Sequence, residues 1–320
     1  MASKINHVSV AWTGPSELDG KPVALLACVG GNLKVGGGIG RQVVALSVVS
    51  LDTVAAVLHP DNASKPPIQM GTTYVASLDA GAIDSVCDDS CVHKHERRCY
   101  AQFNIQSVTE PIATIRRAFP AGYGSTLPVV LQTTPLAKVH KSMRGMLRTF
   151  RFREGDRYRL MVVGSSAAVP AAVIAALVEV FEAFEMTPLA YVENWRDRPD
   201  LRLTHMASCY SAKDVTEAIA ASWVPFYSPE AHELGNTIPD GMIMCPGSAY
   251  RAKAGLSKVT CAMCGLCSGA RADGKIKPGV VSIRHANGDA GKVAAHVRHG
   301  RLGRLILNNK GRMVGAYAAL

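Results

Sequence analysis

The chain has 320 residues, of which 48% are hydrophobic and 19% are charged, and this excludes a disordered protein. Its length allows one large α/β domain or two ordinary ones, and its net charge of +10 favours an anionic partner. We find neither a hydrophobic signal core nor a charge-free membrane span, so we expect a cytoplasmic protein with no membrane partner.

Residues 1–126 are predicted to be a β-rich, irregular N-terminal region. Short apolar runs at Val23–Val29, Val43–Val49 and Val54–Leu58 are typical of strands, because Gly and Pro clusters separate them. The glycine-rich stretch over residues 30–40 lacks the Gly-Lys-Ser/Thr ending of a P-loop, so we expect a hairpin or loop there. A helix is expected at Glu110–Arg117.

Residues 127–244 change to alternating strands and helices. This alternation predicts parallel strands with crossover helices, hence an α/β fold built as a partial or full βα barrel. The predicted strands are Val129–Gln132, Arg159–Val163, Leu189–Glu193, Thr204–Ala207, Val224–Tyr227 and Gly241–Met244, and the helices are Leu136–Phe150, Pro170–Glu185 and Ala212–Ala221. Chemistry in such a fold gathers at the carboxyl ends of the strands, which makes Glu193 a candidate catalytic residue and puts Cys245 at the mouth of the barrel.

Residues 245–320 are predicted to be a cysteine-rich basic module. Cys245-Pro246 is followed by Cys261, Cys264 and Cys267 in the pattern C-P-x14-C-x2-C-x2-C. Three thiolates so closely spaced suit one corner of a [4Fe–4S] cluster, with Cys245 as the remote fourth ligand. Zinc is the alternative metal, although it more often takes two separated cysteine pairs, and disulfides or unliganded thiols are a third reading.

A second cluster lies upstream, where Cys87, Cys91 and Cys99 give C-x3-C-x7-C and Tyr100 follows the last cysteine. Three thiolates can hold a [4Fe–4S] cluster and leave one iron open to a cofactor such as S-adenosylmethionine. The alternatives are a structural zinc site that includes His93 or His95, and unliganded thiols. The nine cysteines in motif-like clusters, without a secretion signal, favour metal in a reducing compartment over a disulfide framework.

The positive charge is concentrated after residue 250, where the sequence has thirteen Lys and Arg residues and only two acidic residues, Asp273 and Asp289. We therefore expect nucleic acid as a partner of this module; a solubilising tail, or compensation of anionic thiolates, is the alternative. The candidate contact residues are Arg251, Lys253, Lys258, Arg271, Lys275, Lys277, Arg298, Arg301 and Arg304.

Several of these motifs in order resemble the bacteriophage gene product eighty-eight-like family, a group without a settled activity. The motifs are Gly31-Asn32-Leu33-Lys34-Val35-Gly36, Cys99-Tyr100-Ala101, the strands around Leu160–Ser165 and Tyr191–Trp195, His205-Met206-Ala207-Ser208, the C-terminal cysteines and Arg284-His285. The resemblance implies a radical-SAM-like barrel with cysteine-bound clusters, in the cytoplasm of an infected host. Similar proteins carry a Gly-Asp-rich motif where this chain has Gly164-Ser165-Ser166-Ala167, so roles that depend on those carboxylates do not transfer.

Two functions follow from these patterns. The first is an iron–sulfur enzyme of radical-SAM-like type that acts on a nucleic acid or nucleotide, with the upstream cluster catalytic and the C-terminal cluster auxiliary. The second is a non-enzymatic nucleic-acid-binding phage protein with structural iron–sulfur or zinc sites. A barrel that keeps its clusters for redox sensing or assembly is a third reading, and the sequence leaves the oligomeric state open.

Overall fold

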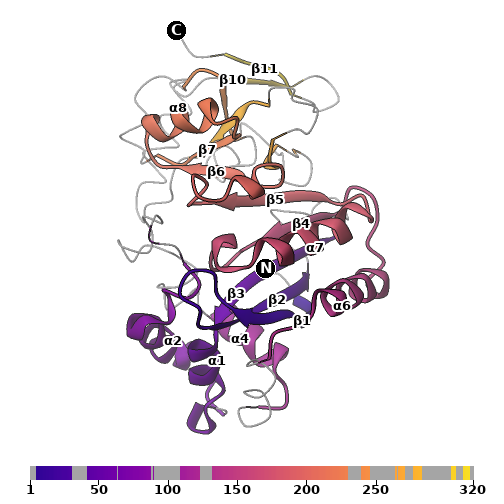
Figure 1. The fold of residues 1–320 in the computed structure, drawn as a ribbon, viewed down its shortest axis with the longest axis vertical. Coiled ribbons are helices and arrows are strands. Elements are labelled where there is room, and N and C mark those ends of the chain that lie inside the picture. The colour runs from indigo at the N-terminus through magenta and orange to yellow at the C-terminus, as the bar shows by residue number, and fades with distance from the viewer. Residues whose placement is uncertain are drawn as a thin grey trace. The chain divides into compact units, whose positions relative to one another are not determined.

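A computed structural model gives the fold of the chain (Figure 1). The structure describes residues 5–30, 42–62, 64–87, 89, 109–122, 132–229, 239–245, 264, 266–270, 277–282, 304–307 and 313–317. The chain forms two compact units: unit 1 comprises Met1–Asn32 and Gln42–Thr187, and unit 2 comprises Leu33–Arg41 and Pro188–Leu320. The predicted regions 1–126, 127–244 and 245–320 divide the chain at other points.

Unit 1 contains a mixed sheet with the strand order β1-β2-β3-β4. Its strands are β1 (Ile5–Pro15), β2 (Pro22–Gly30), β3 (Val43–Ser50) and β4 (Arg157–Leu160). The first three are antiparallel neighbours, whereas β3 and β4 are parallel. Every residue from Val23 to Ala27 is 0% exposed, because β2 is apolar on both faces and lies between two strands. The predicted strands at Val23–Val29 and Val43–Val49 are confirmed.

The helices between β3 and β4 begin with α1 (Leu51–Leu58), α2 (Gly71–Ser77) and α4 (Thr109–Ala118), with the short turns η2 (Pro60–Asn62), η3 (Pro67–Met70) and η4 (Leu78–Ala82). The prediction of a strand at Val54–Leu58 is wrong. Ser50 caps this segment as a helix by accepting a hydrogen bond from the Thr53 N–H at 3.1 Å. Val54, Val57 and Leu58 then fall on one buried helical face.

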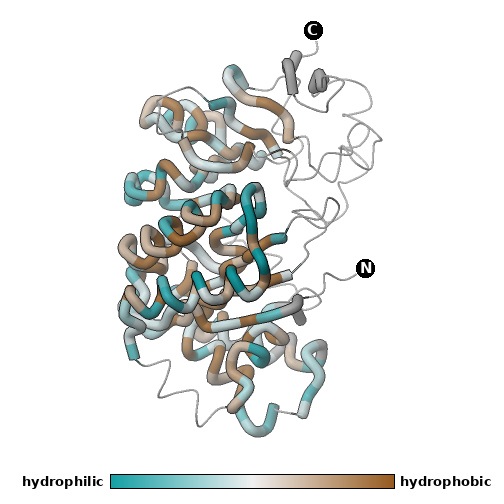
Figure 2. The backbone as a smooth tube through the Cα atoms, turned by 90° about the vertical axis from the view of Figure 1, so that its right-hand side faces the viewer, coloured by the Kyte–Doolittle hydropathy of each residue, from teal (hydrophilic) through white to brown (hydrophobic). Residues whose placement is uncertain are grey.

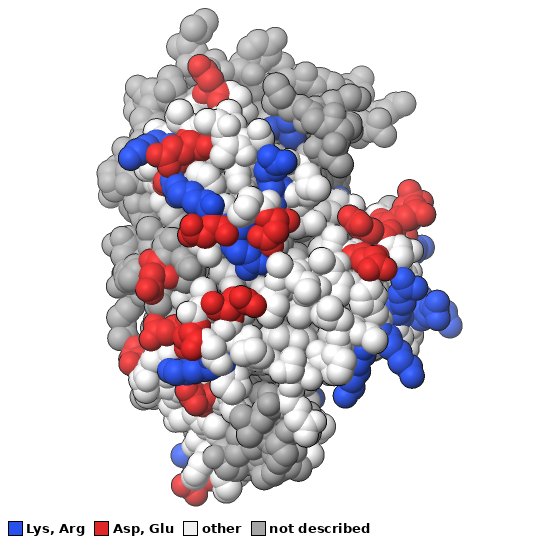
Figure 3. All heavy atoms as spheres, in the orientation of Figure 1, with Lys and Arg blue, Asp and Glu red and all other residues white. Residues whose placement is uncertain are grey.

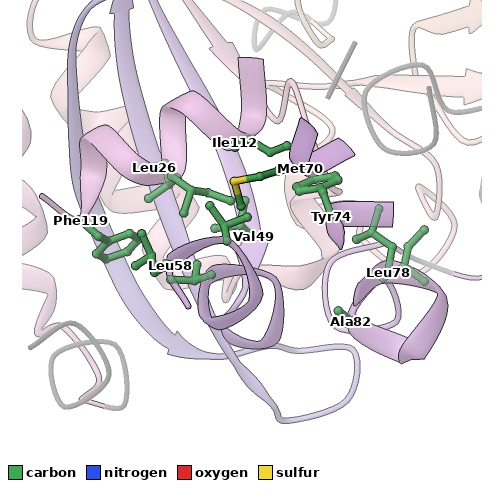
Figure 4. Close-up of a cluster of buried hydrophobic side chains, with 14 of the residues drawn as sticks. Leu26, Val49, Leu58, Met70, Tyr74, Leu78, Ala82, Ile112 and Phe119 are labelled. Carbon is green, nitrogen blue, oxygen red and sulfur yellow. The ribbon is translucent and has the colours of Figure 1, made fainter. Parts of the chain in front are cut away.

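These helices and the sheet enclose an apolar core (Figure 4). Leu26 and Val49 come from the sheet, Leu58 and Tyr74 from α1 and α2, and Ile112 from α4. Burial of such side chains contributes on the order of 25 cal/mol per Å² of apolar surface and holds α1, α2 and α4 together. Brown and teal residues alternate along the chain in Figure 2, as expected for elements with one buried face.

Unit 1 continues with α6 (Leu136–Thr149), which precedes β4, and with η5 (Ser166–Ala168) and α7 (Ala171–Glu182), which follow it. All three of the helices predicted at Glu110–Arg117, Leu136–Phe150 and Pro170–Glu185 are confirmed, with ends shifted by up to three residues. The predicted strand at Val129–Gln132 lies, apart from Gln132, outside the described residues.

Unit 2 contains a sheet with the strand order β5-β6-β7-β9-β8, and every described pair in it is parallel. Its elements are β5 (Thr187–Val192, which begins at the last residue of unit 1), η6 (Pro199–Leu201), β6 (Met206–Cys209), α8 (Ala212–Ala220), β7 (Pro225–Tyr227), β8 (Met242–Met244) and β9 (Gly279–Val281). Two further strands, β10 (Arg304–Leu307) and β11 (Met313–Tyr317), form an antiparallel pair.

The α/β class and the parallel strands are therefore confirmed, whereas a full barrel is wrong. The N-terminal region is only in part β-rich, because α1, α2 and α4 follow its three strands. The described strands do not close into a barrel, because β1 and β8 are the two ends of the strand order. A radical-SAM-like barrel remains a prediction. None of the described helices has the length and apolar character needed to cross a membrane.

Candidate functional site

The carboxyl ends of the unit 2 strands form a common edge. Cys209, Tyr227, Val281 and Met244 are register partners in β6, β7, β9 and β8, so these strands end level with one another. Ligands of open α/β sheets bind outside the carboxyl ends of the strands. This edge is therefore the first place to look for a site in unit 2.

The residues just beyond that row continue the ladder by one hydrogen bond each. Ser228, Ser282 and Cys245 donate their N–H groups to carbonyls of the row, at 2.9, 2.9 and 2.7 Å. Cys245 is half-buried and its backbone is fixed by β9. The sequence prediction that Cys245 follows a strand at its carboxyl end is thus confirmed.

The carboxyl end of β5 carries polar atoms that the fold leaves unsatisfied. Glu193 follows β5 and is half-buried, as expected for the candidate catalytic residue, and Asn194 and Trp195 come next. In the described part of the chain, the Oδ1 of Asn194 and the Nε1 of Trp195 are buried and have no hydrogen-bond partner. A buried polar group without a partner costs about 1–3 kcal/mol, so these two atoms mark the carboxyl end of β5. Trp195 itself is 2% exposed.

The neighbouring helix α8 uses its own residues to satisfy its N-terminus. Ser211 accepts a hydrogen bond from the Asp214 N–H at 3.1 Å, and the Asp214 carboxylate accepts one from the Ser211 N–H at 3.0 Å. Arg196 donates to the other Asp214 oxygen at 2.7 Å and lies 4.1 Å from the centre of the Trp195 ring. An anion would have to displace the Asp214 carboxylate, so this helix end is not arranged to bind phosphate.

Cys209 has the properties of a structural residue. Its side chain is 0% exposed, and burial, with the nearby Asp214 carboxylate, raises the pKa of its thiol to about 12. The thiol donates to the Ala207 carbonyl at 3.4 Å. Thiolates rather than thiols are nucleophiles and metal ligands, and Cys209 stays protonated near neutral pH.

The C-terminal cysteine segment is anchored on the amino-terminal side of β6. The Ala270 N–H donates to the Arg202 carbonyl at 2.8 Å, and a Cβ on Gly269 would lie 2.4 Å from that carbonyl oxygen. Lys277 donates to the Ser268 carbonyl at 2.7 Å and also contacts the Ser268 hydroxyl. Cys264 is half-buried and Cys267 is 9% exposed. Gly269 is required because only a residue without a side chain allows the two backbones to pack this closely.

The upstream cluster begins at a fixed point of unit 1. Ser85 is held on both sides, because its carbonyl accepts from Ser16 Oγ at 2.6 Å and its hydroxyl donates to Asp19 at 2.7 Å. The Val86 carbonyl accepts from the Ser165 N–H at 2.7 Å, just beyond the carboxyl end of β4. Cys87 follows and is 7% exposed within the apolar core. The position of Cys87 agrees with a cluster ligand beside the strand ends, and it agrees equally with a small apolar residue of the core.

The remaining predicted residues divide by whether the structure describes them. Lys277, a candidate nucleic-acid contact, donates a hydrogen bond from its ammonium group to the Ser268 carbonyl. Arg304, another candidate contact, lies in β10. Outside the described residues lie Cys91, Cys99, Tyr100, Arg251, Lys253, Lys258, Cys261, Arg271, Lys275, Arg298 and Arg301.

Within the described ranges, no three His, Cys, Asp or Glu side chains are grouped as a metal site. Cys245 lies at the carboxyl edge of its sheet, whereas residues 269–270 contact the chain before β6. No protein-family model, curated protein or solved structure matches the chain. Sequence reasoning missed the buried atoms of Asn194 and Trp195, because only their burial makes them distinctive.

Proposed function

We propose that this chain is an iron–sulfur protein whose C-terminal cysteines, Cys245, Cys261, Cys264 and Cys267, bind a [4Fe–4S] cluster. The observation that carries the proposal is the place of Cys245, which directly follows β8 at the carboxyl edge of the parallel sheet. The other three cysteines lie in the connection from β8 to β9, and these two strands are adjacent in the sheet.

The donor chemistry supports iron–sulfur over other cofactors. All four ligands are thiols, and soft thiolates bind iron–sulfur clusters and zinc in preference to magnesium or calcium. The C-x2-C-x2-C spacing matches the cysteine run of bacterial-type cluster sites. Zinc is the metal that competes for the same thiolates, and the iron and sulfide content of the protein distinguishes a zinc site from an iron–sulfur cluster.

The described cysteines are not grouped, and cluster binding would have to bring them together. Metal binding often supplies the free energy that orders such a ligand loop, so the ligands converge only when the metal is present. Pro278 and Gly279 return the connection to β9, where the pair Met242 and Gly279 fixes one end and Cys245 the other. A connection with both ends on two adjacent strands can close around a cluster without disturbing the sheet.

The upstream cysteines Cys87, Cys91 and Cys99 are proposed as the ligands of a second cluster with one open iron. The support is that Cys87 follows a segment hydrogen-bonded beside the carboxyl end of β4. When bound, such a cluster with S-adenosylmethionine supplies radical chemistry. The protein's part would be to hold the cluster and exclude water, and the basic C-terminal residues favour a nucleic acid or nucleotide as the substrate.

Iron analysis of single-cysteine variants tests both sites in the full chain. After anaerobic reconstitution with iron and sulfide, Cys264→Ala is expected to lose about half of the bound iron, because each cubane holds four irons. Cys99→Ala is expected to lose a similar share and to abolish reductive cleavage of S-adenosylmethionine. Cys209→Ala is the matched control, since its thiol is buried and protonated. Iron content unchanged in Cys264→Ala would reject the C-terminal cluster.

A further inference from the structure

Helix α6 presents a row of cations that neither cluster uses. Between Gln132 and Arg153 the chain has no Asp or Glu, and acidic residues resume only at Glu154. The α6 basic surface is defined here as Lys138, Lys141, Arg144, Arg148, Arg151 and Arg153. Arg144 is half-buried and the other five are exposed. In Figure 3 a group of blue side chains stands on the flank where Figure 1 places α6.

The helical repeat separates these cations from the buried face. Val139, Met143, Met146 and Leu147 of α6 are buried, and at 100° per residue they span an arc of about 100°. Lys138, Lys141, Arg144 and Arg148 span an arc of about 120° on the opposite side. Because the apolar side is already packed in the core, α6 has no apolar face to insert into a membrane.

The described part of the chain does not neutralise the cations on this surface. Among the residues that the structure describes, none of the six has an ion pair, whereas Arg196, Arg198 and Lys213 each have at least one. His140, on the edge of the buried face, lies 3.6 Å from Glu179 of α7. Six unpaired cations on one surface attract a polyanion.

Gly145 of α6 and Arg151 of the surface depart from local conformational preference. Gly145 lies mid-helix, where glycine destabilises, yet a Cβ there would meet nothing within 4 Å. Arg151 follows the helix with φ 55°, a left-handed conformation in which glycine is strongly preferred. Gly145 leaves the helix backbone open between Lys141 and Arg148, and Arg151 keeps a cation at the helix end.

We propose that the α6 basic surface binds the phosphate backbone of a double-stranded nucleic acid. From Lys138 to Arg148 the helix rises about 15 Å. Duplex DNA carries one charge per about 1.7 Å of axis, so about nine phosphates lie along that length. Cations in a straight row suit this regular array of charges, and they carry no sequence specificity. The proposal does not depend on either cluster, nor on the C-terminal basic module.

Fluorescence anisotropy with a labelled random-sequence duplex DNA tests the proposal in the full chain. The double variant Lys141→Gln/Arg148→Gln is expected to bind the duplex roughly 60-fold more weakly at 0.1 M salt. The slope of log Kobs against log[salt] should fall by about 2, since each phosphate contact contributes about 0.9 to that slope. Lys21→Gln/Lys213→Gln is the matched control, because it removes two exposed lysines that lie near carboxylates.

Arg151→Gly gives a second, independent readout. It removes a cation while placing the preferred residue in the left-handed position, so the Tm is expected to hold or rise while duplex affinity falls. Unchanged affinity and salt slope in the Lys141→Gln/Arg148→Gln variant would overturn the proposal and assign duplex binding to the C-terminal cations. Equal losses in the control variant, or losses seen only with vesicles containing phosphatidylserine, would also overturn it.

Discussion

Protonation of His205 should destabilise unit 2 in mild acid. His205 is 0% exposed, and burial, with the nearby Arg198 guanidinium, lowers the pKa of its imidazole from 6.5 to about 3. Its Nδ1 lies 2.8 Å from the Thr204 hydroxyl, in the loop that contacts Gly269. The ring is therefore neutral in the folded protein and is charged in the unfolded chain below pH 6.5.

The sign and size of the effect follow from the two pKa values. Between pH 6.5 and about 3 the unfolded chain binds the extra proton, so stability is present above pH 6.5 and is lost as the pH falls. Each pH unit in this window costs about 1.4 kcal/mol at most, which gives a loss of roughly 2 kcal/mol between pH 7 and pH 5.

Urea unfolding at pH 7 and pH 5 measures this loss directly. His205→Asn keeps a polar side chain without a titrating group, so its free energy of unfolding should change about 2 kcal/mol less over this interval than that of the wild type. His59→Asn is the matched control, since His59 is exposed and forms a surface contact with Asp61. If His205→Asn and the wild type lose equal stability between the two pH values, the claim that His205 is buried in its neutral form is refuted.

Three further changes test other parts of the structure. Gly269→Ala should lower the Tm, because its Cβ would meet backbone atoms at 2.4 Å and overpacking costs about 1–3 kcal/mol. Leu203→Ala, on the exposed surface of the same loop, should leave the Tm unchanged, and equal Tm values for the two variants would contradict the packing. Asp156→Ala should destabilise unit 1 by about 2–4 kcal/mol in urea unfolding. Its buried carboxylate accepts hydrogen bonds from the Gln42 N–H at 3.0 Å and from the Arg153 N–H at 2.9 Å, and a change below about 1 kcal/mol would contradict this role. Cys209 should resist iodoacetamide at pH 8 until the chain is unfolded, as mass spectrometry of tryptic peptides can show, and rapid labelling would exclude its buried, protonated state.

Local patterns were sufficient for the elements in which one preference dominates. The apolar run Val23–Val29 and the helix Ala212–Ala221 carry period and capping signals that tertiary contacts do not override. Because the strands of unit 2 end where the sequence indicates, Glu193 and Cys245 were placed correctly at strand ends. The α/β class and the parallel pairing follow from the same alternation.

Non-local features could not be predicted in this way. β9 lies between β7 and β8 although it follows both in the chain, and no local signal reports that pairing. The short apolar run at Val54–Leu58 fits a strand or a buried helix equally well, and the cap at Ser50 decides for helix. The buried atoms of Asn194 and Trp195 became visible only from the burial of each side chain.

The iron and acid-labile sulfide content of the anaerobically purified full chain, with its absorption spectrum, tests the central proposal most directly. Two cubanes predict about eight irons and eight sulfides per chain and a broad brown absorption that fades on reduction. A colourless protein with stoichiometric zinc and no sulfide would contradict the iron–sulfur function and leave the cysteines as structural zinc ligands.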